Sequence, residues 1–282
     1  AGIETIAELE DMARTAVKRN DRLRVSDLRF VLVEAAPRIM PEVPADRAEK
    51  VVAELRARGI EVLLNTSLSD ATDGHLELIN MGDKSPAGEL DTDTLIWTAG
   101  VAASPMLKDT DFPIDERGRV RVGADLRVTG DNGVVEGAWA AGDNAAVPDL
   151  TGGGVGGFCV PNAQHASRQA SKLAENLLAA RRGESLTDYY HETIGVVAGL
   201  GVGKGVANFK GKTIGGPLAW LMHRAYHGYA IPTAERTARV LGVWAMNQIF
   251  GRDTTPIRHQ RSPRRAFQLA TGTAPEKTKA RL

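Results

Sequence analysis

The chain has 282 residues, which is enough for one large domain or two ordinary domains. Its 35 basic and 35 acidic residues balance, so nucleic acid is not expected as a partner. The single cysteine, Cys159, excludes a disulfide framework, a paired redox motif and a cysteine-rich metal site, and no metal is expected. No run of about 18 apolar residues is present, so no segment is expected to span a bilayer, and no signal peptide is recognised.

Helices and strands alternate through the first hundred residues, which predicts an α/β domain with a parallel sheet. Apolar residues at helical spacing predict a helix that opens at Gly2, and a second helix is expected at 46–58, ending before Gly59. β-rich runs predict strands, one of them buried, and a Gly/Pro turn at 82–88 predicts a hairpin. The expected strands are 28–34, 60–64, the hairpin pair 75–80 and 89–91, and the buried strand 94–98.

The opening helix has no strand before it, so we expect the chain to be a fragment that lacks the first strand of a strand-turn-helix unit. Gly2 then represents the last glycine of a dinucleotide-binding fingerprint, and the helix amides after it face a pyrophosphate. Glu34, at the end of the next strand, is placed to accept hydrogen bonds from a ribose and to repel a 2′-phosphate, which favours NADH over NADPH. Alternatively, Glu34 is an ordinary acid at the end of a strand, with no ligand. Arg38 is the counter-argument to NADH preference, since it could turn to a phosphate; otherwise it pairs with a surface acid.

The stretch from Gly137 to Asn144 predicts a short buried strand that runs into a glycine turn and presents Asp143 at its tip. Ligands of open α/β sheets lie beyond the carboxyl ends of strands, and Gly142 permits close backbone approach. The Asp143 carboxylate can accept hydrogen bonds from a sugar or ribityl hydroxyl. The alternative is an Asp that caps a helix beginning near Asn144.

The C-terminal part is expected to contain a helix at 162–182, strands at 196–201, 207–209 and 212–214, and two further helices from Pro217 and at 233–250. The last two helices are too short to cross a membrane but carry aromatic residues beside Arg and His, as interfacial helices do. A basic tail follows them, with Arg252, Arg258, Arg261, Arg264 and Arg265. The alternatives are a dimer interface and a solvated tail.

Five motifs in order carry a family resemblance: Gly2-Ile3-Glu4-Thr5, Val33–Pro41, Trp97-Thr98-Ala99-Gly100-Val101, Ala140-Ala141-Gly142-Asp143 and Pro161-Asn162-Ala163-Gln164. The chain resembles the FAD-dependent pyridine nucleotide oxidoreductases, and within them the type II (non-proton-pumping) NADH:quinone dehydrogenases. The resemblance implies the Rossmann-like fold with two dinucleotide-binding domains, N-terminally truncated, and a C-terminal helical region. It divides the chain into an NADH domain (1–104), the returning part of the FAD domain (105–182) and a membrane-docking or dimer region (183–282).

The resemblance also implies site residues. Asp143 and Gly142 belong to the FAD site, and Gly2, Glu4 and Glu34 to the NADH site, with Glu4 near the nicotinamide. Gly100 lies where the two nucleotides approach, and Ala163 and Gln164 line the flavin and quinone pocket, with Gln164 and Glu4 as the catalytic residues. Two departures stand out. The usual first third with the FAD glycine fingerprint is absent, so this chain is expected to bind FAD poorly or not at all. Arg168 stands where the family places a second Gln, which argues against the quinone pocket and favours the soluble reductase. Gln169 is expected to face elsewhere on the helix.

The function expected from these features is transfer of a hydride from NADH to FAD and of two electrons to a respiratory-chain quinone, at the cytoplasmic face of the membrane. One alternative is a soluble NAD(P)H-dependent flavin reductase with a protein or dye acceptor, in which the C-terminal helices form a homodimer interface. The other is an inactive NADH-binding fragment. Cys159 is expected to be a buried structural thiol rather than a redox centre. His165 is expected to be a helix-surface histidine, with proton donation to a quinone as the alternative.

Overall fold

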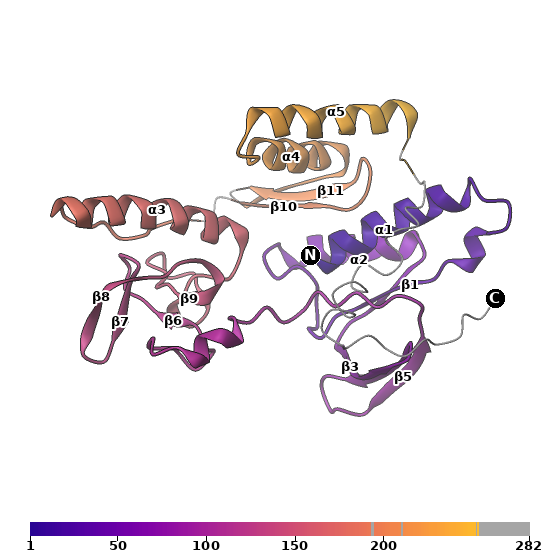
Figure 1. Ribbon diagram of the computed structural model, residues 1–282. Coiled ribbons are helices and arrows are strands. Elements are labelled where there is room, and N and C mark those ends of the chain that lie inside the picture. The colour runs from indigo at the N-terminus through magenta and orange to yellow at the C-terminus, as the bar shows by residue number, and fades with distance from the viewer. Residues whose placement is uncertain (193–194, 210, 252, 254–282) are drawn as a thin grey trace, which may run out of the picture.

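The computed structural model describes residues 1–192, 195–209, 211–251 and 253. Figure 1 shows a first group of elements, formed by residues 2–91, joined by an extended segment to a second group, formed by residues 105–182. The strands β10 (Gly195–Gly199) and β11 (Gly205–Phe209) lie between the helices α1 (Gly2–Val17) and α4 (Gly216–Tyr229). The helix α5 (Ala234–Phe250) forms the outermost layer. The basic-tail residues Arg252, Arg258, Arg261, Arg264 and Arg265 lie outside the described residues.

The first group confirms the predicted alternation of helices and strands. Two strands pair in parallel, with Phe30 opposite Ile60 and Val33 opposite Leu63. The α2 side chains Ala48, Val51 and Leu55 are buried because their spacing places them on one face of the helix. Gly59, just past this helix, has a φ of +84°, which glycine adopts without strain. The elements are α1 (Gly2–Val17), a 3₁₀ turn (Val25–Asp27), β1 (Phe30–Val33), α2 (Ala45–Ala57) and β2 (Ile60–Leu63).

An antiparallel sheet follows, in the order β3-β4-β5. Its strands are β3 (Thr66–Thr72), β4 (His75–Asn80) and β5 (Pro86–Asp91). The predicted hairpin is confirmed as β4 and β5, whereas β3 was not predicted because its sequence, TSLSDAT, is polar and lacks a β-rich run. Strand formation there depends on pairing with β4.

The prediction of a buried strand at 94–98 is wrong. The segment is irregular, and the exposed fractions of Leu95, Ile96 and Trp97 are 47%, 48% and 63%. A β-rich run becomes a strand only when a neighbour offers backbone groups to pair with. In the part of the chain that the structure describes, β1 pairs with β2, and no strand pairs with 94–98.

The second group has two small ribbons with α3 beside them. The parallel pair is β6 and β9, and the antiparallel pair is β7 and β8. The predicted buried strand before Asp143 is wrong in its burial: Gly137 is exposed and Ala138 and Trp139 are half-buried at the end of β8, because a two-stranded ribbon leaves side chains uncovered. The elements are a 3₁₀ helix (Pro105–Asp109), β6 (Val120–Arg121), β7 (Arg127–Gly130), β8 (Gly133–Trp139), a 3₁₀ turn (Gly142–Asn144), β9 (Ala145–Ala146), a 3₁₀ turn (Val155–Gly157) and α3 (Ala163–Arg182).

The C-terminal part is an antiparallel sheet, β10-β11-β12, under two helices. Its elements are β10 (Gly195–Gly199), β11 (Gly205–Phe209), β12 (Lys212–Gly215), α4 (Gly216–Tyr229) and α5 (Ala234–Phe250). The helix α4 packs close to β11 at Gly205, which has no side chain. A Cβ at this position would lie only 2.7 Å from the Trp220 backbone nitrogen. None of the described helices combines the length and the apolar character that a membrane crossing needs.

The C-terminal sheet shares its core with the first group. Ala198, Leu200 and Val206 belong to the same buried cluster as α1, α2, β1 and β2. Arg58, just after α2, donates hydrogen bonds to the Ala7 carbonyl, the Leu200 carbonyl and the Glu10 carboxylate. Since Glu10 is only 2% exposed, this ion pair is buried and joins α1, α2 and the residue after β10.

Replacement of a core leucine should distinguish this cluster from the exposed segment 94–98. Leu55→Ala removes a fully buried side chain and should lower the free energy of unfolding by about 2–5 kcal/mol. The matched change Leu95→Ala removes a half-exposed side chain and should cost no more than about 0.5 kcal/mol. Urea unfolding followed by circular dichroism measures both. A large cost at Leu95 would show that 94–98 is buried.

Candidate functional site

The turn that follows β8 presents Asp143 at the surface. Gly142 has a φ of +74°, and its N–H donates to the side-chain oxygen of Gln169 over 2.7 Å. Asp143 lies inside the short 3₁₀ turn and does not cap it, and the turn has no side-chain cap. The exposed carboxylate therefore faces solvent from a turn whose backbone is held by α3, which suits an acceptor of ligand hydroxyl groups.

The N-terminus of α3 lies beside this turn. Asn162 caps the helix by accepting from the His165 N–H over 2.8 Å. Ala163 is exposed and Gln164 is half-buried, so both are accessible. Arg168 is exposed, and its guanidinium donates to the Gln164 carbonyl over 3.1 Å.

His165 is buried, so the prediction of a helix-surface histidine is wrong. Its Nδ1 lies 2.9 Å from the Tyr189 hydroxyl, and the His191 ring stands 5.6 Å from its own ring, centroid to centroid. Burial lowers the pKa of His165 and of His191 and raises the pKa of Tyr189 to about 12. The three rings are therefore neutral at pH 7, as the burial of polar groups requires. The error arose because Tyr189 is supplied by a distant segment.

Gln169 is the functional neighbour that the sequence analysis missed. As expected, it faces another side of α3 than the exposed Arg168: it is 2% exposed, and its side chain accepts from the Gly142 N–H, a contact that was not predicted. It stands four residues after His165, so the two side chains share one face of α3. The spacing of four residues between His165 and Gln169 was the signal in the sequence from which their shared face could have been predicted. Gly142, Asp143, His165, Gln169 and Cys159 line one small hollow of about 10 Å³.

Cys159 closes this hollow and has the properties of a structural thiol. It is half-buried, and its Sγ lies 3.6 Å from the Pro148 carbonyl oxygen. Burial, with a smaller effect of Asp149, raises the pKa of the thiol, so it is protonated at pH 7. The described residues contain no group of three His, Cys, Asp or Glu side chains that could hold a metal ion.

A second set of expected site residues lies at the start of α1. A Cβ at Gly2 would lie 2.7 Å from the Thr98 hydroxyl oxygen, so any larger residue there would require the Thr98 side chain to shift. Glu4 accepts from the Gly199 N–H over 3.1 Å and lies 3.3 Å from His223 Nε2. Burial raises the pKa of Glu4, but hydrogen bonds from His223 and Gly199 outweigh it and lower the pKa below its usual value. Glu4 is thus an ionised group between α1 and the C-terminal sheet.

The third expected region is the turn after β1. Glu34 is half-buried, and its carboxylate accepts from the Ala36 N–H over 2.9 Å. Arg38 forms no ion pair with an acid among the residues that the structure describes, so the predicted pairing with a surface acid is not found there. Its guanidinium donates to the carbonyls of Val43 and Pro41, because the turn folds back on it. Gly100 is exposed with a φ of +75°, in the segment that joins the two groups.

Comparison with known proteins places these residues in a family context. Residues 1–170 match the family model described as pyridine nucleotide-disulphide oxidoreductase. The demethylphylloquinone reductase NdbB of Synechocystis sp. is 28% identical over 244 residues, which make up 83% of this chain and 57% of that protein. A type II NADH:quinone oxidoreductase of Staphylococcus epidermidis is 29% identical over 231 residues, 82% of this chain and 54% of that protein. The chain spans about half the length of the curated relatives it matches.

Comparison with solved structures agrees with the family match. The structure of NDH2 from Plasmodium falciparum in complex with NADH has a TM-score of 0.78 and 14% sequence identity, and the match covers 90% of this chain and 65% of that one. At this identity the likeness concerns the fold. The predicted α/β dinucleotide-binding fold class and the resemblance to the type II dehydrogenases are both confirmed.

Removal of the Gln169 amide should loosen the Asp143 turn. Gln169→Leu leaves the Gly142 N–H without its acceptor, which should lower the free energy of unfolding by about 1–3 kcal/mol. The matched change Gln164→Leu, on the half-buried side of the same helix turn, should have a smaller effect. Hydrogen exchange at the Gly142 amide gives the local readout. Equal stability and equal exchange in the Gln169 variant would contradict the role of this hydrogen bond.

Proposed function

Because the chain belongs to the pyridine nucleotide-disulphide oxidoreductase family, we propose that it forms part of a type II NADH:quinone oxidoreductase. In this proposal a hydride passes from NADH to FAD and two electrons pass to a quinone, without proton pumping. The observation that carries it is the exposed Asp143 on a turn that Gln169 holds against α3. The relatives are an NADH:quinone oxidoreductase and a demethylphylloquinone reductase, which supports the same reaction class.

The residues around the turn fit one edge of FAD. The Asp143 carboxylate is accessible to the ribityl hydroxyls, and the positive φ of Gly142 allows close approach of the backbone. The N-terminus of α3 at Ala163 and Gln164 carries a partial positive charge that stabilises anionic charge on a ligand. The hollow of about 10 Å³ is far smaller than a dinucleotide, so these residues hold one side of the cofactor and do not enclose it. When bound, FAD supplies the hydride and electron chemistry.

The NADH site in this proposal lies at residues 1–104. The amides at the start of α1, beside Gly2, face the pyrophosphate, and Glu34 accepts from the ribose hydroxyls. Glu4, whose ionised carboxylate is held by Gly199, lies near the nicotinamide. Gly100, in the joining segment, lies where NADH and FAD approach each other. We assign residues 105–182 to the FAD domain.

Quinone reduction is assigned to the N-terminal turn of α3. Gln164 is half-buried, and its side chain is the proposed contact for the quinone. Arg168, where the family has a second Gln, is held through the Gln164 carbonyl and adds a positive charge at this end of α3. Glu4 and Gln164 are the two proposed catalytic residues because each is placed at an end of the electron path, one near the nicotinamide and one near the quinone.

The outer surface of residues 183–282 is the proposed membrane-docking region, at the cytoplasmic face of the cell membrane. Eight apolar side chains of α4 and α5 are more than 45% exposed: Leu218, Leu221, Tyr229, Leu241, Val243, Met246, Ile249 and Phe250. No residue of α5 is buried, so this helix can place its apolar side chains in a bilayer interface. The rival function is a soluble NAD(P)H-dependent flavin reductase, in which the same surface forms a homodimer.

The first test is flavin binding. The purified chain is titrated with FAD, and a bound-flavin spectrum that NADH bleaches supports the proposal. Asp143→Ala should weaken FAD binding about tenfold or more, as expected for loss of a charged hydrogen-bond acceptor. Asp131→Ala, in the exposed β7–β8 turn, is the matched control. Equal FAD affinity of the Asp143 variant would overturn the assignment, and a chain that binds NADH but no flavin would support the inactive-fragment alternative.

Nucleotide choice tests the role of Glu34. Replacement by Gln keeps the shape but removes the charge that repels a 2′-phosphate, so the preference for NADH over NADPH should fall. Fluorescence titration of the chain with each nucleotide measures the two dissociation constants. Glu61→Gln, at an exposed acid of β2 that pairs with Arg29, is the control. An unchanged ratio of the two constants in the Glu34 variant would place the ribose elsewhere.

Vesicle flotation separates the membrane proposal from the soluble reductase. The chain should float with vesicles that contain anionic phospholipid, and Val243→Asp with Ile249→Asp should reduce the bound fraction severalfold because both side chains are exposed on α5. The control is Leu178→Asp, which is equally exposed on α3. If the α5 variant floats normally but its dimer dissociates in light scattering, the surface is a dimer interface instead.

A further inference from the structure

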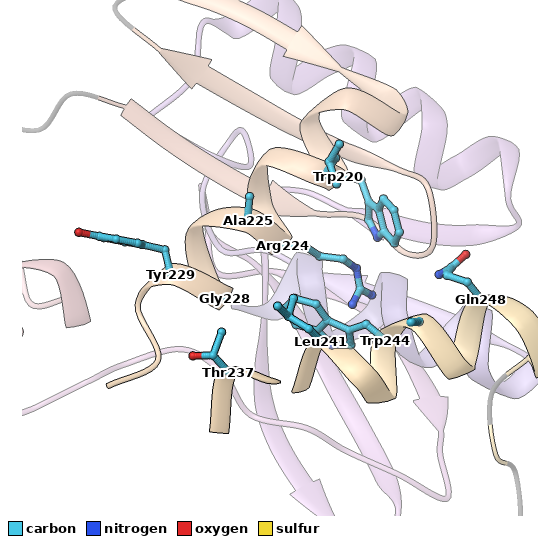
Figure 2. A pocket seen from close by; sticks show the side chains of 11 residues that line it. Trp220, Arg224, Ala225, Gly228, Tyr229, Thr237, Leu241, Trp244 and Gln248 are labelled. Carbon is cyan, nitrogen blue, oxygen red and sulfur yellow. The ribbon is translucent and has the colours of Figure 1, made fainter. Parts of the chain in front are cut away.

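A cavity of about 430 Å³ lies between α4 and α5, apart from the proposed flavin and NADH residues. Its volume is within the range of small-molecule sites. Figure 2 shows its lining, in which Arg224 projects from α4 toward Leu241 and Trp244 of α5. The other lining residues are Trp220, Leu221, Ala225, Gly228, Tyr229, Thr237, Ala245 and Gln248.

The lining is mostly apolar, with the polar side chains Thr237 and Gln248 and one cationic centre. The guanidinium carbon of Arg224 lies 4.6 Å from the centroid of the Trp220 ring and 4.7 Å from that of the Trp244 ring. The guanidinium is charged at every physiological pH, and the two indole faces orient it. The buried Nε1–H of Trp220 has no hydrogen-bond acceptor among the residues that the structure describes. A ligand that complements this lining carries negative charge at one end and apolar surface over the remainder.

Gly228 keeps the space between the helices open. It is buried in α4, and a Cβ there would lie 3.8 Å from both Leu241 Cδ2 and Trp244 Cζ3, an ordinary van der Waals distance. A methyl group is therefore tolerated, whereas a larger side chain extends into the cavity. This position gives a way to fill the cavity without removing any of its existing side chains.

We propose that this cavity binds a fatty-acid-like amphiphile, with its carboxylate at Arg224 and its apolar chain between α4 and α5. Carboxylate is the anion of choice because its two oxygens match the planar guanidinium fork. The chain is placed along Leu221, Ala225 and Leu241, which continue into the exposed apolar surface of the two helices. The proposal does not depend on the quinone reductase function, since no proposed flavin or NADH residue lines the cavity.

The test compares decanoate with decanol, which has the same chain length and no charge. Isothermal titration of the full chain, below the micelle concentration of decanoate, should give saturable binding of one decanoate and about tenfold or more weaker binding of decanol. Arg224→Leu should remove this preference, and Gly228→Leu should abolish binding of both. Arg239→Leu, an exposed arginine of α5 that pairs with Glu235, is the matched control and should bind decanoate as the unaltered chain does.

Each contrary result overturns the proposal. Absence of saturable decanoate binding to the unaltered chain rejects the site, and equal affinity for decanol rejects recognition of the carboxylate. Undiminished binding by Gly228→Leu places the ligand outside the cavity. The comparison of the two ligands uses the unaltered chain, so it decides the question even if a variant does not fold. Gly228→Ala, whose methyl group fits, serves as the folded check on the Gly228 position.

Discussion

The buried ion pair of Glu10 and Arg58 is the interaction on which the arrangement of this chain depends. Arg58 donates to Glu10 and to the carbonyls of Ala7 and Leu200, so one side chain holds α1, the end of α2 and the residue after β10 together. Burial raises the pKa of Glu10, but hydrogen bonds from Arg58 and Arg14 outweigh it and lower the pKa. Loss of one partner would leave an uncompensated buried charge, which typically costs about 3–5 kcal/mol.

The position of Glu4 is related to this ion pair through α1. Glu4 is on the same helix as Glu10, and the contact of α1 with the residue after β10 brings its carboxylate to the Gly199 N–H and to His223 of α4. The N-terminal helix and the C-terminal sheet are thus joined through a shared apolar cluster, a buried ion pair and an ionised carboxylate. A change in the position of α4 would move His223 and so change the surroundings of the Glu4 carboxylate, at the proposed nicotinamide end of the site.

The Asp143 turn follows a different principle, in which an exposed functional group is held by buried polar neighbours. Gln169 fixes the Gly142 N–H, and His165 is held by Tyr189. Functional residues commonly lie on loops that a rigid scaffold positions, and here α3 is the scaffold. The C-terminal helices differ again, since they combine an exposed apolar surface with one arginine held between two indoles.

Short stretches of sequence were enough to predict most of the local elements and the family. Helical spacing of apolar residues was sufficient for α1 and α2, and five motifs in order carried the family resemblance, because each of these signals lies within a short stretch of chain. The exposure of 94–98, the burial of His165 and the contact of Gln169 with Gly142 could not be predicted from the sequence. These depend on whether a strand finds a neighbour, on Tyr189 far along the chain and on a backbone N–H 27 residues away. Pairing and burial are properties of contacts between distant segments, and local sequence does not encode them.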